Sequence, residues 1–184
     1  MPSLFAVLLG GNCAPRSNTE LHDVVFAVGD RIEDTHEQLP DLWFGTPDGL
    51  HIDSWIDLSV ADGHRVTLQR EQPVGGPHLY FVNLGAYLPG AFAEQHACAF
   101  LVADDEAAVE RRARVDLLRG HEQVHTDDLH RVDDRLRLDE VGGWYVALAP
   151  TTDPATTRPH NGYLPLPPEL LARHAARRNR SDTP

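Results

Sequence analysis

Apolar residues follow strand spacing through the first third of the chain. Residues 4–9 read LFAVLL, and such an unbroken apolar run is typical of a strand that is covered on both faces. A second strand is expected at 23–28, and the alternation of apolar and polar residues over 52–60 indicates a half-buried third strand. The Asp-Gly pair at 62–63 then predicts a tight hairpin that returns through 65–68.

Two other stretches carry apolar residues at helical spacing. The first covers 30–44, with Asp30 as a candidate N-cap and Pro40 expected to shorten the helix. The second covers 104–119, where Val109 and its apolar neighbours recur at about 3.6 residues per turn. Strands and helices in this mixture predict an α+β protein.

The same pattern occurs twice along the chain. The segment LFAVLLGG at 4–11 matches LYFVNLGA at 79–86. After one deleted residue, the matching positions lie 74 residues apart, as His22 and His96 do. The paired positions are Pro15 with Pro89, Glu20 with Glu94, His22 with His96, Phe26 with Phe100, Val28 with Val102 and Asp30 with Asp104. The order is kept with only two small gaps, so the sequence predicts an internal duplication.

Each copy is expected to fold as a β-β-α-β-β unit, and the two tandem units are expected to pack with pseudo-twofold symmetry. The predicted first repeat covers 1–72 and the second covers 73–150, because the Pro- and Gly-rich stretch at 71–78 is the natural boundary. Residues 151–184 are rich in proline and threonine. There we expect an irregular strap, packed by apolar side chains such as Tyr163, and then a short basic helix or tail.

Composition narrows the classes of partner. The formal net charge of −12 opposes binding to phosphate backbones, so no nucleic-acid partner is expected. No apolar run approaches the roughly 20 residues of a membrane helix, so no membrane partner is expected either. All 16 basic residues are arginines, which excludes Schiff-base chemistry and the lysine of a P-loop. Cys13 and Cys98 form no disulfide framework, which favours a cytoplasmic protein with reduced thiols, and Cys98 is expected to be buried in a strand.

A Glu-x-His pair and a His-x-Asp pair are the candidate chemical groups. In the first copy these pairs are Glu20 with His22 and His51 with Asp53. Residues i and i+2 of a strand project from the same face, so each pair presents an imidazole and a carboxylate side by side. The residues predicted for the second copy are Glu94, His96, His125 and Asp127. If the strand ends adjoin, each copy assembles two imidazoles and two carboxylates.

Two imidazoles and two carboxylates suit a divalent metal such as zinc, iron or manganese. The same groups also suit proton transfer, because a carboxylate beside an imidazole orients the ring and raises its basicity. A structural interpretation stays open, because Glu–His and His–Asp pairs also satisfy each other's hydrogen bonds at sheet edges. The pattern has none of the specificity of an H-E-x-x-H zinc motif.

The segments ELHDVVFAVG and GLHIDSWIDLSVADGHRVTL, with the repeated Glu-x-His and His-x-Asp pairs, resemble the bacterial domain of unknown function 1543 family. The resemblance covers residues 3–150 and is more specific in the first copy. Members of that family carry one or two copies of this unit. The resemblance therefore implies an uncharacterised cytoplasmic bacterial protein, and it implies no particular activity.

Three functional hypotheses remain open at this point. The first is a duplicated α+β protein that binds a divalent metal or a small polar ligand through the eight Glu, His and Asp residues named above. The second is a non-catalytic interaction protein, such as a homodimer, in which the charged pairs only fix geometry. The third is a metal-dependent hydrolase that keeps a water molecule on an open coordination position.

Overall fold

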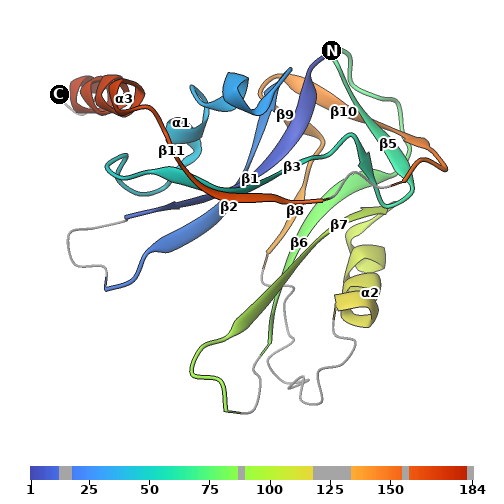
Figure 1. The fold of residues 1–184 in the computed structure, drawn as a ribbon. Helices are drawn as coiled ribbons and strands as arrows, with labels where there is room; N and C mark the ends of the chain where they lie inside the picture. Colours follow the sequence, from blue (N-terminus) through green and yellow to red (C-terminus); the bar gives the residue numbers. More distant parts are fainter. Residues whose placement is uncertain (13–17, 87–89, 118–133, 155–157, 182–184) are drawn as a thin grey trace. The chain divides into compact units, whose positions relative to one another are not determined.

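The computed structural model describes residues 1–12, 18–86, 90–117, 134–154 and 158–181 (Figure 1). These residues fold into mostly antiparallel sheets with a few helices, which confirms the predicted α+β class. Among these residues, no helix is both long enough and apolar enough to span a membrane.

The chain forms two compact units. The terminal unit combines Met1–Ser59 with Ala155–Pro184, and the central unit is Val60–Pro154. The units are divided differently from the sequence repeats, because the hairpin of the first repeat at 60–69 belongs to the central unit. The central unit therefore contains most of the second repeat together with the hairpin of the first.

A four-stranded antiparallel sheet forms the centre of the terminal unit. Its strands are β1 (Ser3–Gly11), β2 (Leu21–Gly29), β3 (His51–Asp57) and β11 (His160–Pro165), in the order β11-β3-β1-β2. β1 pairs with both β2 and β3, and it is buried along most of its length, as its apolar run predicts. Figure 1 shows β11 running beside β3 at one edge of this sheet.

One face of this sheet carries the hydrophobic core of the terminal unit. Phe5, Val7 and Leu9 alternate along β1, and alternate positions of a strand share a face. They pack with Val25, Ala27, Ile32, Leu39, Trp43, Leu50, Ile52, Leu166 and Leu170. Gly10 is out of phase with these residues and therefore belongs to the opposite face.

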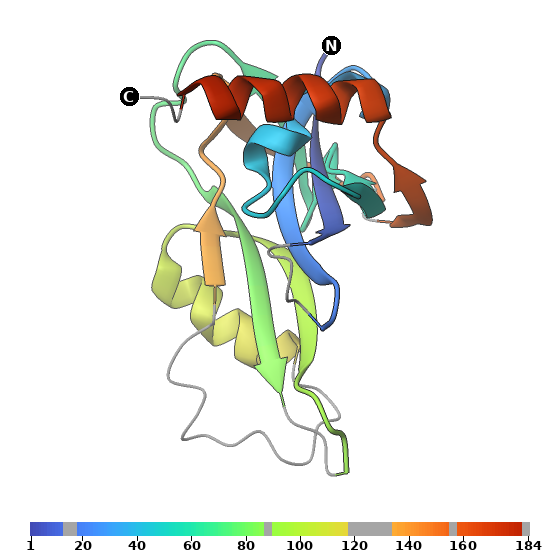
Figure 2. The same ribbon diagram turned by 90° about the vertical axis from the view of Figure 1, so that its left-hand side faces the viewer.

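The helix expected at 30–44 is interrupted. The chain instead forms a 3-10 turn, η1, at Ile32–Thr35 and a four-residue helix, α1, at Leu39–Leu42. Pro40 lies in the first turn of α1, where its missing N–H is tolerated, and it cannot continue a helix from the residues before it. The longer helix α3 at Pro168–Ser181 packs against α1 (Figure 2).

The proline-rich strap is partly a strand. Its residues in β11 pair with β3, which supplies backbone hydrogen bonds to an otherwise open sheet edge. Leu166 is buried, as expected for a residue that packs the strap. Tyr163 is 67% exposed, but its ring lies 4.3 Å from the His51 ring between centroids, so the strap packs only in part through this residue.

The first sheet of the central unit is built from two hairpins. β5 (His64–Gln69) pairs with β10 (Trp144–Pro150), and the two-residue strands β4 (Val60–Ala61) and β9 (Glu140–Val141) flank them. The strand order is β4-β5-β10-β9, and all neighbours are antiparallel. One hairpin comes from each sequence repeat, so this sheet joins the two copies.

Both of these hairpins turn through residues with positive φ. Asp62 has a φ of 48° and Gly63 a φ of 72°, which fits the tight turn that the Asp-Gly pair predicts. In the second copy, Gly142 and Gly143 have φ values of 58° and 76°. The two copies therefore use the same kind of turn in the corresponding hairpin.

The second sheet of the central unit is covered by a helix. Its strands are β6 (His78–Ala86), β7 (Gln95–Ala103) and β8 (Asp134–Arg137), in the order β7-β6-β8, and α2 (Glu106–Leu117) packs against β7. The core between them contains Tyr80, Val82, Leu84, Leu101, Ala103, Val109 and Ala113. Cys98 lies in β7 but is exposed, so its predicted burial is wrong.

Candidate histidine–carboxylate site

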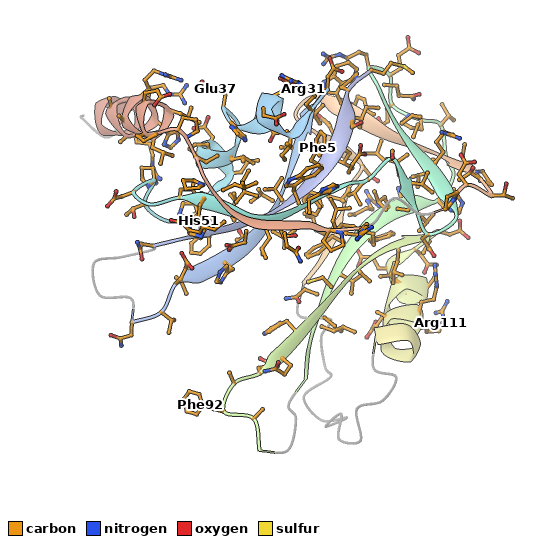
Figure 3. The ribbon with its side chains drawn as sticks, in the orientation of Figure 1. Phe5, Arg31, Glu37, His51, Phe92 and Arg111 are labelled. Atoms are coloured by element: carbon orange, nitrogen blue, oxygen red, sulfur yellow. The ribbon has the colours of Figure 1, made fainter. Side chains whose placement is uncertain are left out.

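Three neighbouring strands of the terminal unit bring the predicted residues of the first copy together. His22 in β2 is paired with Gly10 of β1, and the same glycine is paired with His51 at the start of β3. Residues paired across antiparallel strands project to the same face, so both imidazoles lie on the side of Gly10. Glu20 directly precedes β2, and Asp53 follows His51 by two residues. Figure 3 labels His51 at this end of the sheet.

Each imidazole faces both carboxylates. His51 Nε2 lies 3.2 Å from Glu20 Oε1 and 3.3 Å from Asp53 Oδ1. His22 Nε2 lies 3.1 Å from Asp53 Oδ2 and 3.8 Å from Glu20 Oε2. The two sequence pairs therefore form one group of four residues, which we call the His–carboxylate cluster, and not two separate ion pairs.

Gly10 leaves the space that the cluster occupies. A Cβ atom at this position would lie 2.5 Å from Asp53 Oδ2 and 2.6 Å from His51 Nε2. Both distances are far below van der Waals contact, so a larger residue would displace the cluster. This role of Gly10 depends on the register of β1 between β2 and β3, and sequence reasoning missed it.

His51 is the buried member of the cluster, with 2% relative exposure. Its Nδ1 lies 2.8 Å from the Gly49 carbonyl oxygen, which can only accept, so Nδ1 is the donor, and the neutral form of the ring has no proton on Nε2. The Nε2 atom then presents a lone pair to the oxygens of Glu20 and Asp53. Within the described part of the chain, His51 Nε2 and Asp53 Oδ2 have no hydrogen-bond partner. Facing acceptors repel each other, so this arrangement requires a cation or a second proton.

The cluster is open to solvent on one side. The side chains of Glu20 and His22 are about half exposed, and that of Asp53 is 26% exposed. The buried imidazole of His51 is therefore held in place, while the side chains of Glu20 and His22 have room to adjust. An ion bound among these groups would keep a face accessible to water or to a ligand.

The nitrogen–oxygen distances in the cluster can be compared with the spacing of ligands around a metal ion. Four ligands at about 2.1 Å from an ion, in tetrahedral arrangement, lie roughly 3.4 Å from one another. Three contacts in the cluster measure 3.1, 3.2 and 3.3 Å, and the fourth measures 3.8 Å. Among the described residues, no group of three or more His, Cys, Asp or Glu is arranged to hold an ion as it stands. Metal binding at the cluster therefore requires the exposed side chains to adjust.

The second copy repeats half of this arrangement in the central unit. Glu94 Oε2 lies 3.7 Å from His96 Nε2, close to the 3.8 Å between the matching atoms of the first copy. Gly85 is paired with His96, so a glycine again lies opposite the histidine. His125 and Asp127 lie outside the described residues, and their place in a second site stays a prediction.

Fold and site together define a duplicated α+β protein in which each copy sets a Glu-x-His pair beside a glycine of the neighbouring strand. The family model named Domain of Unknown Function (DUF1543) matches residues 17–68 and 91–140, which is more than half of the chain. The chain therefore belongs to the DUF1543 family. The two matched segments confirm the tandem duplication.

A solved structure of a protein with a related sequence supports the fold. The crystal structure of a protein Il1583 from Idiomarina loihiensis is 34% identical in sequence, with a TM-score of 0.72. The match covers 91% of this chain and 99% of that chain. No curated protein matches the chain.

Proposed function

We propose that the His–carboxylate cluster binds one divalent metal ion, which holds a small polar ligand at the open side. The observation that carries this proposal is the buried Nε2 of His51, which faces two carboxylates without a hydrogen bond. A cation beside Nε2 would replace repulsion between acceptors with attraction to each of them. The Gly49 carbonyl at Nδ1 supports this role, because histidines that bind metals almost always donate their other N–H to such an acceptor.

The donor set favours zinc, iron or manganese, because these ions accept imidazole and carboxylate ligands together. Glu20 and His22 are the ligands that would adjust, since both are about half exposed and their side chains have room to rotate. His51 would stay in place, because it is buried and hydrogen-bonded to Gly49. Small rotations of these exposed side chains would bring their donor atoms closer to a common ion.

A metal-dependent hydrolase is the second candidate, and the open side of the cluster favours it. A water molecule on a free coordination position of zinc can lose a proton near neutral pH and attack a substrate. The competing structural role predicts that the pairs satisfy each other by hydrogen bonds. The Nε2 of His51 lies within ion-pair distance of both carboxylates but makes no hydrogen bond, so the structural role would need a second proton on this ring.

The two copies are proposed to form β-β-α-β-β units related by a pseudo-twofold axis. In the β5–β10 pair, Val66 is paired with Leu148 and Leu68 with Val146. In the sequence, however, Val66 matches Val146 and Leu68 matches Leu148. Equivalent residues thus exchange partners, as a local twofold axis between the strands requires.

The proposed setting is the cytoplasm of a bacterium. The net charge of −12 supports a small ligand over a nucleic acid. The exposed free thiol of Cys98 supports a reducing compartment over an oxidising one. The ligand class is a small polar molecule with an oxygen or nitrogen donor for the metal.

Calorimetric titration of zinc, manganese and iron(II) into protein without a histidine tag tests the metal site. We expect at least one ion per chain, and one fewer in the variants His22→Ala and Glu20→Gln. These two residues are the right choice because they are exposed, so their replacement removes a ligand without opening the core. His36→Ala, which lies outside the cluster, should bind as the unchanged protein does.

Two results would contradict the metal site. One is a wild-type chain that takes up none of the three ions at micromolar concentration. The other is a His22→Ala variant that keeps the stoichiometry and the affinity of the wild type, since the cluster would then not be where the ion binds.

A further inference from the structure

The terminal unit has a hollow of about 420 Å³. Its wall is mostly apolar, with Leu50, Pro165, Leu166, Leu171 and Ala172 among the lining side chains. They come from the loop before β3, the end of β11 and the first turns of α3. A hollow of this size with apolar walls is in the range that holds small ligands.

The hollow and the cluster share residues that contact His51. The Gly49 carbonyl, which lines the hollow, accepts the hydrogen bond of His51 Nδ1. The ring of Tyr163, which also lines it, lies 4.3 Å from the His51 ring between centroids. Pro165 is paired with His51 across β11 and β3. The hollow is therefore lined by residues that contact His51, whose Nε2 faces the carboxylates of Glu20 and Asp53.

The charges around the hollow limit what can bind there. Among the described residues that line it, Asp48 carries a charge and none is an arginine. A phosphate or a polyanion would meet Asp48 and the carboxylates of the cluster without a basic partner, which opposes its binding. Tyr163 adds an aromatic surface that is 67% exposed, suited to stacking with an apolar or aromatic group.

We propose that the hollow binds the aromatic or branched apolar group of a small ligand whose oxygen donors coordinate the metal at the cluster. This inference rests on the metal site proposed above. It names the ligand class more closely: an uncharged or singly charged molecule that joins an oxygen chelating group to an apolar group. Tyr163 would contact both the apolar group in the hollow and the chelating group at the cluster.

Hydroxamates provide a direct probe, because acetohydroxamate and benzohydroxamate offer the same chelating group with and without a ring. Zinc is first titrated into the protein, and each hydroxamate is then titrated into the zinc-loaded protein. We expect benzohydroxamate to bind at least about tenfold more tightly, because burial of the ring removes apolar surface from water. Ala172→Trp should reduce this ratio to about one by filling the hollow, while Ala172→Ser should keep it.

The order of the titrations separates the two proposals. A protein that binds no zinc overturns both at the first step. A protein that binds zinc, but shows the same hydroxamate ratio with Ala172→Trp as without it, overturns the hollow alone. If Ala172→Trp does not fold, Tyr163→Ala provides the second test, because this exposed ring can be removed without disturbing the core. An unchanged ratio in Tyr163→Ala would also overturn the hollow.

Discussion

Two glycines determine the geometry of the cluster at the scale of single residues. Gly10 provides the space above β1, and the Gly49 carbonyl orients the buried ring of His51. Neither residue would bind the ion, yet both decide where Nε2 of His51 and the oxygens of Asp53 lie. Their contribution is positional, so it can be separated from that of the four donor side chains.

Gly10→Ala is expected to reduce zinc affinity by about tenfold or more, because the new Cβ would displace His51 and Asp53. The crowding should also lower the free energy of unfolding by about 1–3 kcal/mol. Calorimetry and urea unfolding measure the two effects. Gly162→Ala is the matched control, since a Cβ there meets nothing within 4 Å and both quantities should stay close to wild type. Equal zinc affinity in the two variants would contradict the role of Gly10.

The four residues of the His–carboxylate cluster were predictable from the sequence as neighbouring pairs, and the residues that position them were not. Period-two spacing places Glu20 beside His22 and His51 beside Asp53 whatever the fold. Their meeting depends on β1 lying between β2 and β3 in a register that sets one glycine opposite both histidines. No local pattern encodes such a register, so the role of Gly10 could not be predicted from the sequence.

At the scale of elements, the hairpin of the first repeat is tied to β7 and α2 by one carboxylate. Asp62 in the β4–β5 turn accepts hydrogen bonds from both terminal nitrogens of Arg112, at 2.7 and 2.8 Å, and from the Val102 amide, at 2.7 Å. Partial burial alone would raise the pKa of Asp62, but these hydrogen bonds outweigh it and hold the pKa below the ordinary 3.8. The ionised carboxylate therefore stabilises the central unit above about pH 4.

Asp62→Asn is expected to lower the free energy of unfolding by about 1–2 kcal/mol at pH 7, a value reduced by partial solvent exposure. Asparagine tolerates the positive φ at this position, so the turn should survive. Because the folded pKa is depressed, the difference from wild type should shrink as the pH falls below about 4. Urea unfolding at pH 7 and pH 3.5 measures it. Asp30→Asn is the control: its side chain is 71% exposed, so the free energy of unfolding should change little. A difference between Asp62→Asn and wild type that does not depend on pH would contradict the role of the ionised Asp62.

Strands and turns were easier to predict than the helices and the C-terminal strap. The Asp-Gly pair encodes its turn directly, because that turn needs two residues with positive φ. The segment at 30–44 has a helical apolar pattern, but Pro40 and the short span between strands divide it. β11 has exposed side chains throughout and thus no hydrophobic alternation, so only the open edge of β3 explains it.

At the scale of the whole molecule, duplication could be predicted from the spacing of matched residues, and the family match confirms it. The division into compact units was not predictable, because the first hairpin pairs with its own counterpart and so joins the central unit. Pairing of equivalent strands is a contact between distant segments, which the pattern within each copy does not encode.

The central claim is that a metal ion belongs in the His–carboxylate cluster. Its most direct test is a crystal structure of the zinc-loaded protein with anomalous data collected at the zinc edge. We expect an anomalous peak about 2.1 Å from Nε2 of both His22 and His51, with oxygens of Glu20 or Asp53 completing the site. A zinc-loaded crystal with no peak at this position, or with hydrogen-bonded water between the same side chains, would contradict it.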